Sequence, residues 1–175
     1  MYLISLYFDE KTNKTLQRYI DRIAKSTGNL FMTENKVPPH MTVSAIEAKS
    51  IDELIDPFEN ICRKVKSDEI MFVSTGQLLP YVFYLAPVMN SYLAGMSRLI
   101  YDEYSKLEDI KISRYYQPDK WLAHVTLAKK LTKDQMMTAL GVMQNEFGPF
   151  EARTSRIGLS RVNPHEDVRT HILDI

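Results

Sequence analysis

The sequence predicts an α+β fold, a duplicated bilobal sandwich of antiparallel sheets with helices outside and a central cleft between two similar strands. Two observations indicate this fold. Pairs of short strands alternate with amphipathic helices along the chain. Residues 38–44 (PPHMTVS) and 122–128 (LAHVTLA) both place a His-x-Thr motif among apolar residues, and a shift by the interval between the two histidines superimposes their neighbouring elements. We expect one domain, residues 1–175, made of two pseudo-symmetric lobes at about 1–87 and 88–175.

The first half predicts the order strand, helix, strand, helix, strand, strand. Apolar residues at helical spacing run from Asp9 to about Thr27, and Gly28 suits the C-cap of that helix. A second helix follows Ser50, which forms a candidate capping box with Glu53. The strands are expected at residues 2–8, 38–44, 69–76 and 81–86, the last two joined by a turn around Pro80.

The second half repeats this order from the first helix onward. A helix is expected from about Val88 to Leu107, and a tyrosine-rich loop then leads into the second His-x-Thr strand. Thr132 and Gln135 form a second candidate capping box, at the start of a helix that reaches about Phe147. The strands of this half are expected at residues 122–128, 152–161 and 167–174.

Composition excludes several classes of protein. The chain has 175 residues, with 22 basic and 22 acidic side chains and a formal net charge of +0, so no overall field draws it to nucleic acid or to an anionic membrane. The apolar start, MYLISLYFDE, has no basic region and meets acidic residues too early for a signal peptide or a membrane span. The single cysteine, Cys62, leaves no internal disulfide and no thiolate pair for a metal. These features predict a cytoplasmic protein that needs no membrane.

The two His-x-Thr motifs are the candidate catalytic residues. Alternate residues of a strand share a face, so His40 lies beside Thr42, and His124 lies beside Thr126, while the residues between them face a core. A phosphodiester displacement needs a base for the attacking oxygen and an acid for the leaving oxygen, and two imidazoles can supply both near neutral pH. The threonine hydroxyls can donate hydrogen bonds to phosphate oxygens. This chemistry requires no metal and no cofactor.

These residues resemble the 2H phosphoesterases, a family that includes 2′-5′ RNA ligase-like proteins and cyclic nucleotide phosphodiesterases. The resemblance rests on the motifs at His40/Thr42 and His124/Thr126, the prolines before the first, and the duplicated layout. It implies a bilobal fold with a central cleft, metal-independent action on cyclic phosphates or 2′-5′ linkages, and active-site roles for both histidines and both threonines. It also implies a substrate contact for Arg161, at the end of the segment GLSR.

Other residues have two interpretations. A lone His-x-Thr on a strand is usually structural, but two equivalent copies favour a shared site. His165 and His171 are interpreted as turn and solvent-face residues; a metal site of four histidines is a weak alternative, because neither motif has a carboxylate or thiol at ligand spacing.

Aromatic residues could stack a base at the rim of the cleft or simply pack, and Tyr84 is the candidate substrate-binding residue among them. This set comprises Tyr81, Phe83, Tyr84, Tyr115 and Tyr116. Lysines beside the motifs, Lys129 and Lys130 among them, could attract phosphate or be solvated strand edges.

The leading functional hypothesis is a phosphoesterase that opens a 2′,3′-cyclic phosphate or a related phosphodiester on a nucleotide or RNA end. One alternative is a module that binds RNA ends or nucleotides without turnover. Another is 2′-5′ RNA ligation, the reverse of cleavage. The sequence leaves open which histidine is the acid, which nucleotide is the substrate, and the oligomeric state.

Overall fold

The computed structural model describes residues 1–162 and 165–175. In these residues one antiparallel sheet of eight strands is accompanied by five α-helices and a short 3-10 helix. The strands are β1 (Tyr2–Phe8), β2 (Met41–Glu47), β3 (Glu69–Leu78), β4 (Val82–Pro87), β5 (Lys111–Ile112), β6 (Val125–Ala128), β7 (Phe150–Arg161) and β8 (Glu166–Ile172). The helices are α1 (Glu10–Thr27), α2 (Phe31–Glu34), α3 (Asp52–Cys62), α4 (Ser91–Tyr104), η1 (Arg114–Tyr116) and α5 (Lys133–Glu146).

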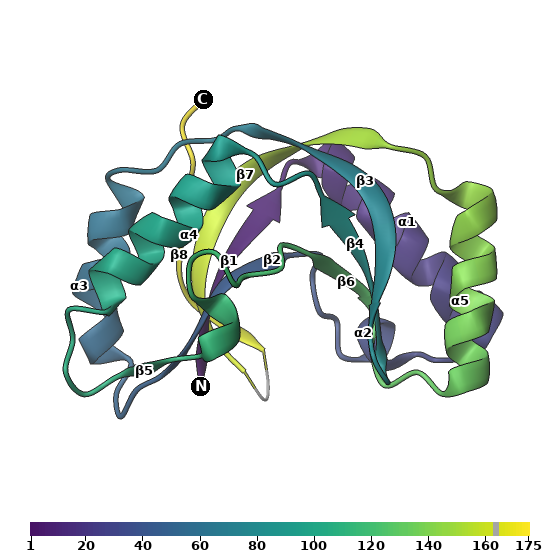
Figure 1. Cartoon of the computed structure of the whole chain (residues 1–175), viewed down its shortest axis with the longest axis horizontal. Helices are drawn as coiled ribbons and strands as arrows, with labels where there is room; N and C mark the ends of the chain where they lie inside the picture. The colour runs from purple at the N-terminus through teal and green to yellow at the C-terminus, as the bar shows by residue number, and fades with distance from the viewer. Residues whose placement is uncertain (163–164) are drawn as a thin grey trace.

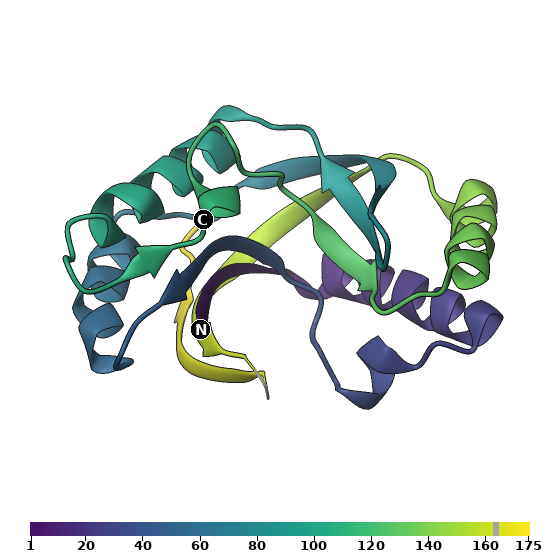
Figure 2. The same ribbon diagram turned by 60° about the horizontal axis from the view of Figure 1, so that its bottom comes forward.

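The long strand β7 joins the two parts of the sheet. The strand order is β5-β2-β1-β7-β3-β4-β6, and β8 also pairs with β7. The first residues of β7 pair with β3, whereas its later residues pair with β1 and β8. The sheet is bent like an arch with a pair of helices at each end (Figure 1), and Figure 2 turns the underside of the arch forward. The predicted α+β fold of antiparallel strands with outer helices is confirmed, with the two expected sheets fused through β7.

Helices α1 and α4 each pack against a different part of the sheet from the strand that precedes them in the chain. We call β1, β2, β5 and β8, with the end of β7, the first sheet half; the second sheet half is β3, β4 and β6 with the start of β7. Helix α1 follows β1 in the chain but packs against β6 and α5, and α4 follows β4 but packs against β2 and α3. Each sheet half is therefore covered by a helix that follows a strand of the other sheet half. The division at about residue 87 stays a prediction drawn from the sequence repeat.

Local sequence signals explain where several helices begin and end. Asp9 accepts a hydrogen bond from the backbone N–H of Thr12 at the start of α1, and Gly28 ends that helix with a φ of 70°, which glycine adopts without a steric penalty. The predicted capping box of α5 is confirmed, because the side chains of Thr132 and Gln135 each accept a hydrogen bond from the other's backbone N–H.

Three expected details differ in the structure. The predicted capping box of Ser50 and Glu53 was wrong, because the Ser50 hydroxyl bonds instead with Asp52, the first residue of α3. Helix α4 starts later than expected, since the Asn90 side chain caps it by accepting from the backbone N–H of Leu93. The two-residue strand β5 was not expected; it pairs with the end of β2.

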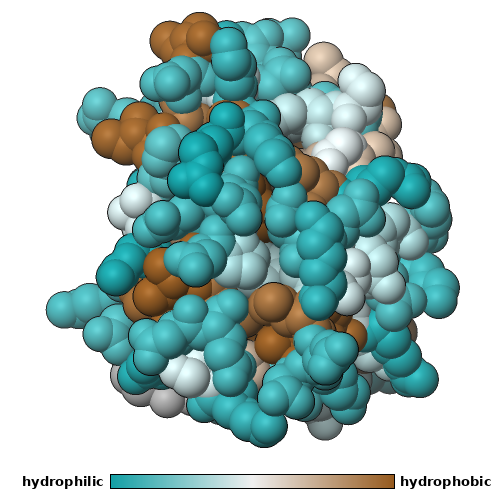
Figure 3. All heavy atoms as spheres, turned by 90° about the vertical axis from the view of Figure 1, so that its left-hand side faces the viewer, coloured by the Kyte–Doolittle hydropathy of each residue, from teal (hydrophilic) through white to brown (hydrophobic). Residues whose placement is uncertain are grey.

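Apolar side chains fill the space between the sheet and the helices. The residues between and after those of the motifs are almost completely buried, as expected for the core side of each strand: Met41, Val43, Val125 and Leu127. By contrast, the outer face at the α3 and α4 end carries mainly hydrophilic residues with small separate apolar patches (Figure 3). No helix among the described residues is both long enough and apolar enough to cross a membrane.

Candidate active site

Both motif histidines are held by the same local hydrogen bond. His40 lies immediately before β2 and its Nδ1 is 2.7 Å from the carbonyl oxygen of Pro38, while Nδ1 of His124, immediately before β6, is 2.8 Å from the carbonyl oxygen of Leu122. A carbonyl oxygen can only accept, so Nδ1 carries the proton in each ring. The Nε2 atom of each neutral imidazole therefore has a free lone pair for a base, and in the charged form it has a proton for an acid.

One cleft of about 480 Å³ is lined by both histidines and both threonines of the motifs. The structure therefore brings together His40, Thr42, His124 and Thr126, as the repeat predicted. Most of the other lining residues are apolar: Met1, Leu3, Phe31, Met32, Val37, Ala45, Leu78, Val82 and Val162. A cleft of this size with a few polar groups on an apolar wall is typical of a small-molecule site.

A hydrogen bond connects the two motif segments. Trp121, three residues before His124, is buried and its Nε1 donates to the backbone carbonyl oxygen of Thr42 over 3.0 Å. The Thr42 hydroxyl lies 3.4 Å from the hydroxyl of Ser5 on the neighbouring strand β1. The backbone of the first motif is thus fixed by a side chain that belongs to the approach to the second.

Burial lowers the pKa of both histidines. For His124 the loss of solvent is the main cause, and the carbonyl of Leu122 acts in the opposite direction. For His40 the loss of solvent again comes first, the carbonyl of Pro38 opposes it, and the charges of His165 and His124 lower the pKa further. Both rings are therefore biased toward the neutral form that a general base requires.

A tyrosine lies against each motif histidine. The ring centroids of Tyr84 and His124 are 5.2 Å apart, and those of Tyr7 and His40 are 6.1 Å apart. Each tyrosine ring covers a glycine on the adjacent strand, Gly76 under Tyr84 and Gly158 under Tyr7, where a Cβ atom would collide with the ring. Sequence reasoning selected Tyr84 but missed Tyr7; the only signal for Tyr7 was the isolated glycine in a strand that lies opposite it.

His165 lies in a turn before β8, as predicted, but it does not simply face solvent. It lines the cleft, and its ring stacks on His40 with centroids 5.7 Å apart. The pairing of β8 with β7 brings it there, and no local pattern in the sequence reports that pairing. His171, on β8, is partly buried and is not among the residues that line the cleft.

The remaining candidates divide between the cleft and the outside. Arg161, at the end of β7, is exposed with Nη1 4.0 Å from Glu166 Oε2, and it is not among the lining residues. Lys129 lines the cleft, whereas Nζ of Lys130 lies 4.6 Å from the ring centroid of Phe31.

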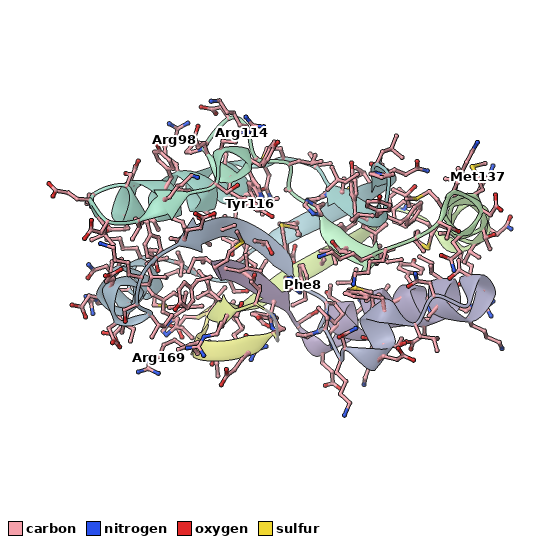
Figure 4. All side chains as sticks on the ribbon, turned by 90° about the horizontal axis from the view of Figure 1, so that it is seen from below. Phe8, Arg98, Arg114, Tyr116, Met137 and Arg169 are labelled. Carbon is pink, nitrogen blue, oxygen red and sulfur yellow. The ribbon has the colours of Figure 1, made fainter. Side chains whose placement is uncertain are left out.

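Among the aromatic candidates, Tyr116 lines the cleft, while Tyr81 and Tyr115 are exposed and Phe83 is in the core. Seen from below, Tyr116 lies nearer the middle of the molecule than Arg114, from the same turn of η1 (Figure 4). The residues described in the structure contain no group of three or more His, Cys, Asp or Glu side chains placed to hold a metal ion.

Comparison with known proteins finds one matching sequence family and several similar solved structures. A sequence model of the 2′-5′ RNA ligase superfamily matches residues 13–166, and a search of curated proteins finds no match. A crystal structure described as a phosphoesterase is similar with a TM-score of 0.65 and 11% identity, over 99% of this chain and 98% of that one.

Two further structures have the same TM-score. Escherichia coli LigT, in complex with 3′-AMP, has a TM-score of 0.65 and 9% identity, over 98% of this chain and 97% of LigT. The protein TT0787 of Thermus thermophilus has a TM-score of 0.65 and 14% identity, over the same shares of the two chains. At these identities the structural likeness shows the fold.

Proposed function

Because the chain belongs to the 2′-5′ RNA ligase superfamily of 2H phosphoesterases, we propose that it hydrolyses a cyclic phosphodiester, 2′,3′-cyclic or related, or a 2′-5′ linkage, on a nucleotide or RNA end. Members of this superfamily act on phosphodiester linkages, so a phosphoesterase or ligase-like activity follows from membership. The single observation that carries the finer proposal is that His40 and His124, each with Nδ1 bonded to a backbone carbonyl, line one cleft with Thr42 and Thr126.

The proposed reaction uses one imidazole on each side of the phosphorus. The neutral ring takes a proton from water, the water oxygen forms a bond to phosphorus, and the P–O bond to the ribose oxygen breaks. The charged ring donates its Nε2 proton to that departing oxygen, which gives a phosphomonoester and a free hydroxyl. The two rings end with their protonation states exchanged, and proton exchange with solvent restores them before the next turnover. No metal or cofactor takes part in these steps.

The threonines and one lysine supply the electrostatic part of the proposal. Hydroxyl groups of Thr42 and Thr126 would donate to the non-bridging oxygens, whose negative charge increases in the transition state. Lys129 would attract the phosphate, and the apolar wall would cover the ribose and base. Structures of E. coli LigT hold 3′-AMP, ATP or NADP⁺, which supports a nucleotide as the substrate class.

The test is hydrolysis of a panel of 2′,3′-cyclic nucleotides and 2′-5′-linked dinucleotides in EDTA. The variants His40→Asn and His124→Asn suit it, because an asparagine amide can still donate to the carbonyl of Pro38 or Leu122 while the reactive Nε2 is lost. Each should lower turnover by about 10²–10⁴-fold with little change in folding. His171→Asn, outside the cleft, is the matched control and should keep wild-type activity.

Other outcomes would redirect the proposal. Activity that EDTA abolishes, or that survives in both variants, would contradict two-histidine catalysis. Tight binding of a cyclic nucleotide without any product would indicate the binding module. Formation of 2′-5′-joined RNA from ends supplied together would indicate the ligase.

A further inference from the structure

A third imidazole lies next to His40 and is held by a polar cluster. The rings of His165 and His40 are stacked at an interplanar angle of 24°. Nε2 of His165 is 3.5 Å from Oδ1 of Asp167, and the hydroxyl of Tyr7 donates to the same carboxylate oxygen over 2.6 Å. Arg156 completes the cluster, with its Cζ 4.2 Å from the ring centroid of Tyr7 and its Nη1 3.6 Å from Asp167 Oδ2.

This cluster makes the surroundings of the two motif histidines unequal. His124 contacts the ring of Tyr84; burial lowers its pKa and the carbonyl of Leu122 opposes that effect. His40 faces His165 from the segment before β8, Asp167 from β8, Tyr7 from β1 and His124 from the segment before β6. The pseudo-symmetry of the motifs is thus broken by residues outside the repeat of His and Thr.

We propose that His165, oriented by Asp167, is a positioning residue that keeps His40 neutral and so makes His40 the general base and His124 the general acid. The assignment of a general base and a general acid rests on the proposed function. The effect of His165 on the protonation of His40 concerns the protein alone and can be measured without a substrate.

The physical argument is the repulsion between like charges at short range. Two imidazolium rings with centroids 5.7 Å apart repel each other, so a charge on His165 disfavours a charge on His40. The carboxylate of Asp167 lies beside His165, with Oδ1 3.5 Å from Nε2. Among the causes that lower the pKa of His40, the charge of His165 comes after burial and outweighs the opposite effect of Asp167. His40 is therefore the ring that stays neutral when a proton enters this part of the cleft.

The experiment is a titration of the imidazole NMR signals of His40 and His124 in the wild type, His165→Phe, His165→Gln and His171→Gln. Phenylalanine keeps an aromatic ring over His40 but removes the charge, whereas glutamine keeps a polar contact for Asp167. The midpoint of His40 should move to higher pH in both His165 variants, and that of His124 should stay in place. His171→Gln, a change in the same strand region but away from the cleft, should move neither.

Several results would overturn the inference. No movement of His40 in His165→Phe is one, and equal movement of His40 and His124 is another. Movement only in His165→Gln would also overturn it, since it would show that His165 acts by covering His40 and not through charge.

The pH dependence of kcat/KM then tests the assignment of roles. In His165→Phe the acidic limb of the profile, which reports the base, should move to higher pH while the basic limb stays. Turnover at the optimum pH should fall by less than about tenfold, whereas the loss of an acid or base lowers it by about 10²–10⁴-fold. Movement of the basic limb alone would reverse the assignment and overturn it. A His40 midpoint that shifts in a protein that hydrolyses nothing would overturn the proposed function while supporting the charge asymmetry.

Discussion

The indole of Trp121 donates a hydrogen bond to the backbone carbonyl oxygen of Thr42, so the approach to one motif fixes the strand of the other. The contact joins residues far apart in the sequence, and it is buried, so water cannot replace the donor if the indole is removed. The relative position of the two motifs therefore depends on this side chain.

Trp121→Phe should reduce both stability and turnover. The variant leaves the Thr42 carbonyl without its donor, which costs about 1–3 kcal/mol in the free energy of unfolding measured with urea. Because it also releases the first motif, turnover should fall by about tenfold or more. Tyr104→Phe is the control, since it removes a buried hydroxyl that donates to the carbonyl of Leu54 away from the cleft. An equal loss of turnover in the two variants would contradict a specific role of Trp121.

The threonine hydroxyls should matter for kcat more than for KM. Thr42→Val and Thr126→Val keep the side-chain volume but remove a donor to the developing charge, which should lower kcat by about 10²–10³-fold. Thr→Ser at each position keeps the hydroxyl and should retain most of the activity. A rise in KM at unchanged kcat would show that the hydroxyls bind the ground state equally well.

Stability should decrease as the pH falls from 7.5 to 5.5. Burial holds the pKa of His40 and His124 below the ordinary imidazole value, so in this range the unfolded chain binds more protons than the folded one. The stability that the neutral rings contribute is therefore complete above the ordinary imidazole pKa. It is lost as the pH falls toward the lower pKa values of the two rings in the folded protein. Urea midpoints at both pH values should show a smaller loss in the His40→Asn/His124→Asn double variant than in the wild type. His171→Asn should behave as the wild type, and an unchanged loss in the double variant would assign the effect to other groups.

Gly76→Ala should be destabilising because of Tyr84. A Cβ at Gly76 overlaps the ring of Tyr84, and the adjustment should cost about 1–3 kcal/mol. In Tyr84→Leu the same substitution should cost less, which a double-mutant cycle in urea measures. The control is Gly95→Ala in α4, where nothing lies within 4 Å of the added atom and a gain of roughly 0.5–1 kcal/mol is expected. Equal costs of Gly76→Ala with and without the Tyr84 ring would contradict the assigned contact.

Local patterns predicted most of the elements and the content of the cleft. The alternation around His40 and His124 located both strands, and the caps at Gly28 and Thr132 located two helix ends, because each depends on residues close in the sequence. The two-residue strand β5 has too few residues to show a period.

Long-range pairing explains what the sequence did not reveal. His165 reaches His40 only through the register of β8 on β7, and Tyr7 lies near His40 only through the pairing of β1 with its neighbours. The exchange of α1 and α4 is equally invisible, because each helix has an apolar face that would suit either sheet half.

The pairing of β1 with β7 has a consequence for how the protein is made. Strand β1 is synthesised well before its partner β7, and the apolar face of α1 stays uncovered until β6 and α5 have been made. Such long-range contacts slow folding and leave apolar surface exposed during synthesis. The nascent chain therefore keeps apolar surface exposed until β7 has been made, and a chain that stops before β7 lacks the strand that joins the two sheet halves.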